Sequence, residues 1–131
     1  MKVVQPDQVG SALVSTADRI AAAGRRAASR VVASLAAEVA TKAKMPGYVP
    51  VRSGVLRDSI VPTKTPGRPD TFEWTVGSNV EYAIPVEYGT RNKDESVRMA
   101  ARPFLRRALV DVGKDAEEMA REIIREEMAR P

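Results

Sequence analysis

Residues 7–44, DQVGSALVSTADRIAAAGRRAASRVVASLAAEVATKAK, decide the fold of this chain because they form a long alanine-rich stretch without proline. Alanine is the best helix former, and apolar or small residues recur here every three or four positions. These positions are Val9, Leu13, Ala17, Ile20, Gly24, Ala27, Val31, Leu35 and Val39. The spacing predicts one long amphipathic helix. Met45-Pro46-Gly47 ends it, because the residue before a proline resists the α conformation.

A basic stripe follows the side of the predicted helix that lies away from its apolar face. Its members are Arg19, Arg26, Arg30 and Lys44. At 100° per residue the stripe lies roughly 140° from the apolar face. Residues 1–50 carry seven basic and three acidic side chains, whereas the two charges are balanced in the rest of the chain. We expect this stripe either to be solvated or to face DNA or an acidic partner.

Two shorter segments predict β-strands. The first is residues 55–62, VLRDSIVP. In residues 71–77, TFEWTVG, every second side chain is apolar, which is the period of a half-buried strand. The segment between them, TKTPGRPD, contains Pro-Gly and Pro-Asp and predicts the loop of a long hairpin. Residues 81–88 could form either a third strand or a short helix, and we favour the helix.

The last third of the chain predicts an exposed, mobile loop and then a helix. Residues 90–101, TRNKDESVRMAA, are polar and have no clear period, whereas Pro103 is suited to the first turn of a helix. The apolar stripe of that helix comprises Leu105, Leu109, Val112, Ala116, Met119, Ala120 and Ile123. The sequence therefore predicts an α+β fold in which a small antiparallel β-sheet packs against a long N-terminal helix and a C-terminal helix. A chain of 131 residues has room for one modest core, so we expect a single domain over residues 1–131.

Composition excludes several classes of function. The chain has neither cysteine nor histidine. Disulfides, the usual zinc, haem and iron–sulfur ligand sets, and Ser-His or Cys-His nucleophile pairs are therefore impossible. We predict no catalytic residue, no cofactor and no metal site, and an acid–base role for Glu81 and Glu87 is only a third hypothesis. The chain also lacks the apolar run of a signal peptide or of a membrane span, so we expect no membrane partner.

Three short motifs follow one another in the chain: VRSGVLRDSIVP, VGSNVEYAIPVEYGT and ARPFLRRAL. Their distinctive residues are Ser53, Gly54, Leu56, Arg57 and Ser59, then Tyr82, Ala83, Val86, Glu87, Tyr88, Gly89 and Thr90, then Pro103, Phe104, Leu105 and Ala108. In this order and spacing they resemble the head–tail joining proteins of long-tailed bacteriophages and prophages, the neck or tail-completion components of the lambdoid minor-tail type.

The resemblance implies a structural virion protein without enzymatic activity, located in the head–tail neck and, during assembly, in the host cytoplasm. It implies a ring, expected to be six-fold, between the portal and connector of the head and the tail. The implied partners are further copies of the chain, connector or stopper proteins, tail terminator or tail tube proteins, and double-stranded DNA that passes through the lumen without sequence recognition. The alternatives are a tail terminator, a minor capsid-associated protein or, in a different class, a non-specific DNA-binding protein.

The resemblance also suggests a role for residues 81–90, EYAIPVEYGT. This stretch is expected to form the corner between the sheet and the loop over 90–101, with Gly89 in an unusual backbone conformation. Glu87 and Tyr88 either buttress this corner or meet the adjacent subunit. We expect the subunit or partner interface to include Glu87, Tyr88, Gly89, Thr90 and Arg91. Arg19, Arg26, Arg30 and Lys44 are the candidate face toward the DNA lumen or an acidic partner.

Overall fold

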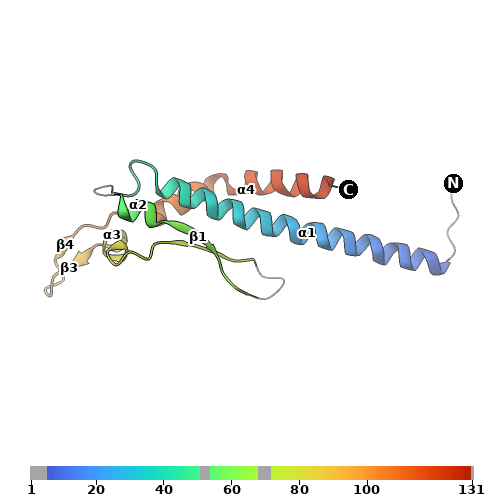
Figure 1. Cartoon of the computed structure of the whole chain (residues 1–131), viewed down its shortest axis with the longest axis horizontal. Coiled ribbons are helices and arrows are strands. Elements are labelled where there is room, and N and C mark those ends of the chain that lie inside the picture. The colour runs from blue at the N-terminus through green and yellow to red at the C-terminus, as the bar shows by residue number, and fades with distance from the viewer. Residues whose placement is uncertain (1–5, 51–53, 68–71, 131) are drawn as a thin grey trace.

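Two long helices form the frame of the molecule. The computed structural model describes residues 6–50, 54–67 and 72–130, with side chains from Ser15 onward. Helix α1 (Pro6–Ala43) and helix α4 (Leu105–Ala129) run side by side (Figure 1). Because α1 has 38 residues and α4 has 25, α1 is longer by roughly 20 Å at 1.5 Å per residue. Its N-terminal part therefore projects past the C-terminal end of α4.

Short elements connect the two helices. In chain order they are α2 (Val55–Ser59), β1 (Val61–Lys64), β2 (Trp74–Gly77), α3 (Ala83–Tyr88), β3 (Thr90–Arg91) and β4 (Val97–Met99). Strands β1 and β2 pair antiparallel, with Val61 opposite Gly77 and Lys64 opposite Trp74. This ribbon packs on α1, on the side away from α4 (Figure 1). The predicted α+β fold is thus confirmed, with two separate two-stranded sheets.

Small side chains build the contact between α1 and α4. On α1 the buried residues are Ala23, Ala27, Ala36, Val39, Ala40 and Ala43, and on α4 the buried apolar residues are Ala108, Val112 and Ile123. Alanine lets two helix backbones approach closely, so that many weak dispersion contacts accumulate although each side chain buries little area. The alanine-rich composition of the first segment therefore serves both helix formation and close packing.

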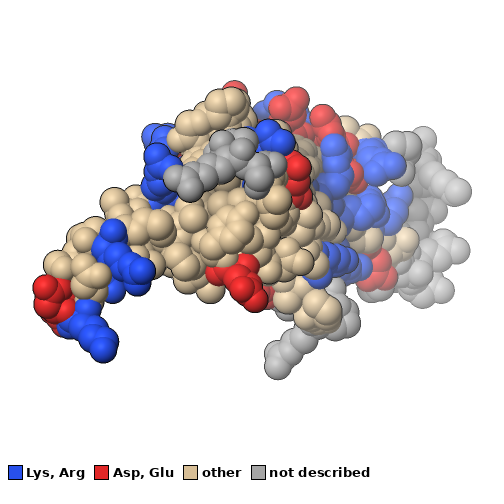
Figure 2. Space-filling model, turned by 60° about the vertical axis from the view of Figure 1, so that its left-hand side comes forward, with Lys and Arg blue, Asp and Glu red and all other residues tan. Residues whose placement is uncertain are grey.

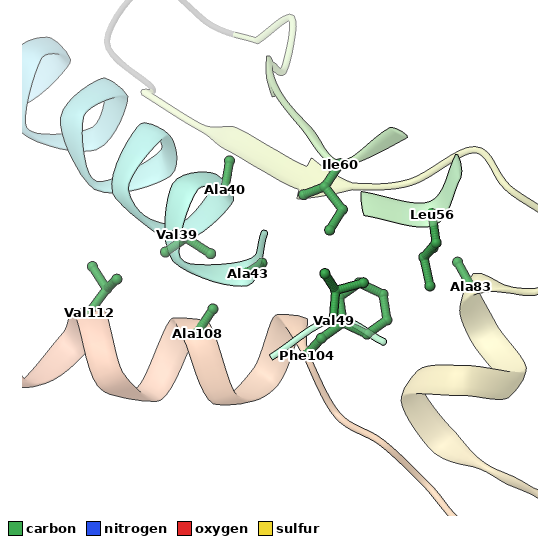
Figure 3. Close-up of a cluster of buried hydrophobic side chains, with 10 residues drawn as sticks. All are labelled: Val39, Ala40, Ala43, Val49, Leu56, Ile60, Ala83, Phe104, Ala108 and Val112. Carbon is green, nitrogen blue, oxygen red and sulfur yellow. The ribbon is translucent and has the colours of Figure 1, made fainter. Parts of the chain in front are cut away.

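One aromatic ring joins the helix pair to the rest of the fold. Phe104, immediately before α4, is completely buried, as is Ile60 at the start of the β1–β2 ribbon. Figure 3 shows Val49 and Phe104 between the ends of α1 and α4 on one side and Leu56 and Ala83 on the other. Because truncating a buried phenylalanine costs about 3–5 kcal/mol, this ring is a major contributor to the stability of the small core.

The predicted strand over residues 55–62 is wrong in its first part. Residues 55–59 form helix α2, and the strand begins only at Val61. Leu56 and Ile60 are both buried, and a helical turn places residues four apart on one side. A strand would also have placed Asp58 on that side, which faces the apolar cluster of Leu56 and Ile60. The strand predicted over 71–77 is confirmed from Trp74 onward. The helix favoured for 81–88 is confirmed as α3. Ser53 and Thr71 lie outside the described residues.

Residues 90–101 form a short hairpin instead of an irregular loop. Strands β3 and β4 pair antiparallel, with Thr90 opposite Met99. The turn is closed by the backbone N–H of Asn92, which donates to the carbonyl of Ser96 at 2.9 Å, and by Asp94, which accepts from the N–H of Ser96 at 3.0 Å. Side chains that bond to their own backbone hold this turn without any apolar pattern. The predicted exposure is confirmed, since residues 91–102 are all exposed. We call residues 90–101 the arm.

Among the residues from Ser15 onward that the structure describes, four members of the predicted apolar stripes lie at the surface: Ala17, Ile20, Gly24 and Leu109. Ile20 is 55% exposed and precedes Ala23, which is the first residue of α1 with a buried side chain among those described. Leu109 is 61% exposed, and its neighbour Ala108 makes the buried contact instead. Val31 and Leu35 are half-buried at the edges of the α1–α4 contact. The contact between α1 and α4 is made mainly by alanines. A hydrophobic pattern does not separate alanines that pack against another helix from alanines that only favour helix formation.

Candidate functional site

Glu87, in the last turn of α3, caps the N-terminus of α4. Its Oε2 accepts hydrogen bonds from the backbone N–H groups of Phe104 at 2.8 Å and Leu105 at 3.0 Å, and its Oε1 accepts one from the N–H of Arg106 at 3.0 Å. The first N–H groups of a helix lack hydrogen-bond partners within the helix and carry partial positive charge. A carboxylate accepts their hydrogen bonds and also balances their charge. We call this arrangement the Glu87 cap.

Arg106 completes the Glu87 cap. Its Nε donates to Glu87 Oε1 at 3.0 Å, its Nη2 donates to the Glu87 carbonyl at 2.7 Å, and its guanidinium lies 4.6 Å from the centre of the Tyr88 ring. Burial by itself raises the pKa of Glu87. The three backbone N–H groups and Arg106 outweigh burial, and they hold this pKa below its ordinary value of 4.5. The carboxylate is therefore charged at neutral pH and fully used in joining α3 to α4.

Gly89 sets the direction in which the arm leaves α3. Its φ of 75° and ψ of 177° belong to a region that essentially only glycine occupies, as the sequence led us to expect. A Cβ at this position would lie 2.7 Å from the carbonyl oxygen of Met99 and 2.8 Å from the nitrogen of Ala101. The backbone N–H of Arg102 also donates to the carbonyl of Val86 at 2.8 Å. Both ends of the arm are thus fixed to α3.

Large apolar side chains surround this corner and remain exposed. Ile84 and Tyr88, one turn apart on α3, are 70% and 63% exposed, and Leu109 and Val110 on α4 are each 61% exposed. Residues three or four positions apart share one side of a helix, so Leu109 and Val110 flank Arg106, which lies over Tyr88. We call Ile84, Tyr88, Leu109 and Val110 the α3–α4 patch.

A groove of about 800 Å³ lies between the arm and α2. Leu56, Pro85 and Val86 contribute apolar surface to it, and the arm contributes Arg98 and Met99. Charged side chains gather at the tip of the narrow projection and over the opposite part of the molecule, whereas the area between them is largely uncharged (Figure 2). The structure thus combines a concave surface and an exposed apolar patch around the same corner.

The basic stripe is divided by the fold. Arg30 Nη1 donates to Glu127 Oε1 at 3.0 Å, Arg26 Nε donates to Glu127 Oε2 at 3.4 Å, and Arg130 lies 3.2 Å from the same carboxylate. Arg30 contributes most to lowering the pKa of Glu127; burial opposes the shift, and Arg130 and Arg26 add to it. We call these three arginines and Glu127 the Glu127 cluster. Arg26 and Arg30 are 48% exposed, yet they reach the buried Glu127 because they follow the buried Ala23 and Ala27 by one turn.

The other members of the predicted sites lie at the surface or at the ends of elements. Arg19 is exposed and donates to Thr16 Oγ1 at 3.5 Å, and Lys44 is half-buried just after α1. Tyr88 is exposed, and Thr90 and Arg91 form β3. The structure therefore brings Tyr88, Gly89, Thr90 and Arg91 together at one corner, whereas the four basic residues do not form one continuous free surface.

Sequence reasoning missed the two residues that complete these contacts. The sequence contains a signal for Glu127, because this residue continues the spacing of Val112, Ala116, Met119 and Ile123. The structure shows that its side chain is 1% exposed. A carboxylate at such a position requires positive partners, and the arginines of the first helix were available. No local pattern indicated Arg106, since its contact with Glu87 depends on how α3 meets α4.

The described residues contain neither a cluster of metal-binding side chains nor a helix that could span a membrane. Over residues 6–50, 54–67 and 72–130, no three acidic side chains gather in a way that could hold a metal ion. No helix in this described part is both long enough and apolar enough to cross a membrane. Every buried side-chain nitrogen and oxygen in the described residues has a hydrogen-bond partner. The buried polar groups, Glu87 and Glu127 among them, therefore act within the fold.

Comparison with known protein families identifies a family for this chain. The family model HK97-gp10_like, described as "Bacteriophage HK97-gp10, putative tail-component", matches residues 10–89. No curated protein and no solved structure matches the chain. The matched span runs from α1 to the glycine that ends α3, and it agrees with the resemblance to phage head–tail and tail proteins that the motifs indicated. Because this span covers more than half of the chain, the protein belongs to the HK97-gp10-like family of bacteriophage tail components.

Proposed function

We propose that this protein is a structural component of the phage neck, which completes the tail and joins it to the DNA-filled head. The observation that carries this proposal is the α3–α4 patch, whose four large apolar side chains are each more than 60% exposed. Exposed apolar groups of this size, clustered at one corner, mark a surface that a partner covers. Membership of a tail-component family makes virion proteins the natural partners.

The proposed assembly is a ring of copies, expected to be six-fold, between the head connector or stopper and the tail terminator or tail tube. An elongated subunit with an arm at one end has different surfaces at its two ends, which favours head-to-tail contacts that close into a ring. In this proposal Tyr88, Thr90 and Arg91 contact the neighbouring subunit or partner. Glu87 and Gly89 do not make this contact themselves. They fix the conformation of the corner that presents Tyr88, Thr90 and Arg91.

The proposed role is structural and not enzymatic. Glu87, which with Glu81 was the acid–base candidate of the sequence, accepts hydrogen bonds from N–H groups at the start of α4 and from Arg106 and has a lowered pKa. A general acid or base at neutral pH needs a pKa near 7 and an accessible proton. The geometry of Glu87 suits a helix cap and disfavours proton transfer.

Non-specific DNA binding is less well supported. It needs several free cations along one stripe, because affinity for DNA grows with the number of phosphates neutralised. Arg26 and Arg30 are paired with Glu127, so that Arg19 and Lys44 are the members of the stripe without an ion pair in the described structure. DNA passing through the lumen would then meet a surface that does not retain it.

Electron microscopy of particles made without this protein tests the proposal. A phage genome that lacks the gene should yield filled heads and free tails that fail to join, and the purified chain should restore joining. Intact, joined particles in the absence of the protein would overturn the proposal. Tails of irregular length in place of unjoined ones would favour the tail-terminator alternative.

Point variants test the α3–α4 patch in the same assay. Ile84→Asp and Val110→Asp place a charge on the patch and are expected to lower the restoring activity at least tenfold, since a charge buried in a contact without a partner is costly. Both side chains are exposed, so helix content and melting temperature should stay close to the wild type. The matched control is Val61→Asp on β1, which is 50% exposed and lies outside the patch. Equal loss in all three variants would show that the patch has no special role.

A further inference from the structure

We infer that the groove beside the arm receives an acidic strip on α4 of a second copy of this chain. The strip consists of Asp115, Glu118 and Glu122. This inference rests on the proposed assembly of the protein with its own copies, and it names the two surfaces that meet.

The groove is suited to a protein segment. Its volume is about 800 Å³, and Leu56, Pro85 and Val86 line it with apolar surface. Tyr82 and Met99, which also line it, are 47% and 39% exposed. A concave, mostly apolar surface with a few polar groups is the usual form of a binding site. The occupant must therefore bring apolar contact as well as charge.

The charge in the groove is positive and unpaired. Arg98 and Arg102 line it, and no aspartate or glutamate does. Across the described ranges, neither guanidinium has an ion-pair partner. Complementary charges across an interface select the partner and fix its register. The groove thus selects a segment that carries carboxylates.

The chain itself has such a segment on α4. Asp115, Glu118 and Glu122 recur at steps of three and four residues, so that they lie on one side of the helix over about 10 Å. All three are exposed and, in the described structure, have no ion-pair partner, whereas Glu117 and Glu126 are paired with Arg121 and Arg30. Met119, half-buried beside the strip, supplies apolar surface. The carboxylates of this helical segment complement the arginines of the groove, and its apolar flank complements the apolar lining of the groove.

One copy does not satisfy both surfaces. The arm is at one end of the elongated molecule, and the C-terminal half of α4 extends toward the other end (Figure 1). Contact between two different surfaces is head to tail, and it produces a closed ring or an open filament according to the rotation between neighbours. Duplex DNA fits less well, because its hydrated phosphates offer nothing to the apolar lining of the groove.

Charge reversal in both surfaces tests the inference. Arg98→Glu with Arg102→Glu, or Glu118→Arg with Glu122→Arg, should each weaken self-association and head–tail joining at least tenfold, because like charges then face each other. All four reversals together should restore most of the loss. The matched control is Arg25→Glu with Glu38→Arg, two exposed residues of α1 outside both surfaces, which should leave assembly unchanged.

Cross-linking gives a second readout that does not depend on joining. The chain has no cysteine, so Arg98→Cys with Glu122→Cys introduces the only two thiols. Oxidation of this purified variant at high concentration should give a ladder of linked subunits on a non-reducing gel, whereas either single variant should stop at dimers. The absence of a ladder, both in solution and in assembled particles, would overturn the inference and leave the proposed function standing.

The remaining outcomes identify other occupants. Loss of joining on reversal of the arginines but not of the acidic strip would assign the groove to a different virion protein. Loss of duplex DNA binding on reversal of the arginines alone would assign it to nucleic acid. Either result would overturn the inference. Normally joined particles without the gene would instead refute the proposed function, while the cross-linked ladder would still report on contact between copies.

Discussion

The two ends of α4 are both held by a buried glutamate, but the groups that hold each carboxylate differ. At the N-terminal end Glu87 accepts three backbone N–H groups and the Nε of Arg106. At the C-terminal end Glu127 accepts only arginine side chains, those of Arg26, Arg30 and Arg130. The helix dipole favours a carboxylate at the first end and opposes it at the second, where the arginines must compensate.

The difference teaches that a similar number of charged hydrogen bonds does not imply a similar contribution to stability. Three of the four donors to the Glu87 carboxylate are backbone N–H groups at or next to the fully buried Phe104, so they cannot turn toward water when the carboxylate is removed. The side chains of Arg26, Arg30 and Arg130 are 48%, 48% and 63% exposed, so they can turn toward water when the Glu127 carboxylate is removed. We therefore expect the Glu87 cap to contribute more to the stability of the fold than the Glu127 cluster does.

The largest expected effect is that of Glu87→Ala. Removing one partner of a buried, hydrogen-bonded charge pair costs about 3–5 kcal/mol, and here it also leaves helix N–H groups unsatisfied. Urea unfolding should show this loss in the free energy of unfolding. The matched control is Glu81→Ala, an exposed glutamate six residues earlier in the chain, which should change stability little. A loss as small as that of the control would mean that the cap does not hold α4.

Gly89→Ala tests the same end of α4 through the backbone. The added Cβ would lie within 2.8 Å of backbone atoms of Met99 and Ala101 at a φ that side chains avoid. Such strain costs about 1–3 kcal/mol, so thermal unfolding should occur at a lower temperature and the arm should shift. Gly77→Ala is the control, because nothing lies within 4 Å of a Cβ there. Equal melting temperatures for both variants would argue against a strained corner.

Glu127→Ala tests the other end and should destabilise less than Glu87→Ala. The three arginines lose their counter-charge, but their exposed side chains regain water. Because these partners are exposed to salt, 1 M NaCl should reduce the stability difference between wild type and variant, whereas the difference for Glu87→Ala should change little. Glu117→Ala, which removes an exposed pair with Arg121, is the control. A stability loss that matches Glu87→Ala and does not respond to salt would contradict the contrast between the two ends.

The smallest expected effect is a difference in pH dependence. The pKa of Glu87 is lowered in the folded state, so near and below its ordinary value of 4.5 the unfolded chain binds more protons and stability falls with acid. This contribution is complete above pH 4.5 and is lost as the pH falls through the lowered pKa. Glu87→Gln cannot titrate in this range, so its stability should fall less steeply than that of the wild type below pH 4.5. Parallel curves would show that Glu87 has the same pKa in both states.

The parts of the fold that the sequence predicted are those whose pattern is local. The long first helix, the strand from Trp74 and the last helix follow from periodicity, alanine content and the position of proline. Helix α2 was mistaken for a strand because five residues satisfy either period. The arm was mistaken for a loop because its turn is held by Asn92, Asp94 and Ser96 and not by an apolar pattern.

The candidate site was only partly predictable for the same reason. The motif around Tyr88 and Gly89 pointed to the correct corner, and the left-handed φ of Gly89 followed from the residue type. The partners across the chain did not follow. Arg26 and Arg30 were expected to be solvated or to face DNA or an acidic partner, and the structure pairs them with a residue of the same chain about 100 positions away.

The sequence by itself determined the two long helices, the lack of thiol and imidazole chemistry, and the family, because these depend on neighbours within a few residues or on composition alone. Only the tertiary structure decided that Glu87 is a helix cap, that Glu127 gathers three arginines, and that the groove and the α3–α4 patch share one corner. The physical reason is that burial and charge pairing depend on which surfaces meet. The packing of α4 against α1 and α3 decides which surfaces meet, and no short-range pattern encodes it.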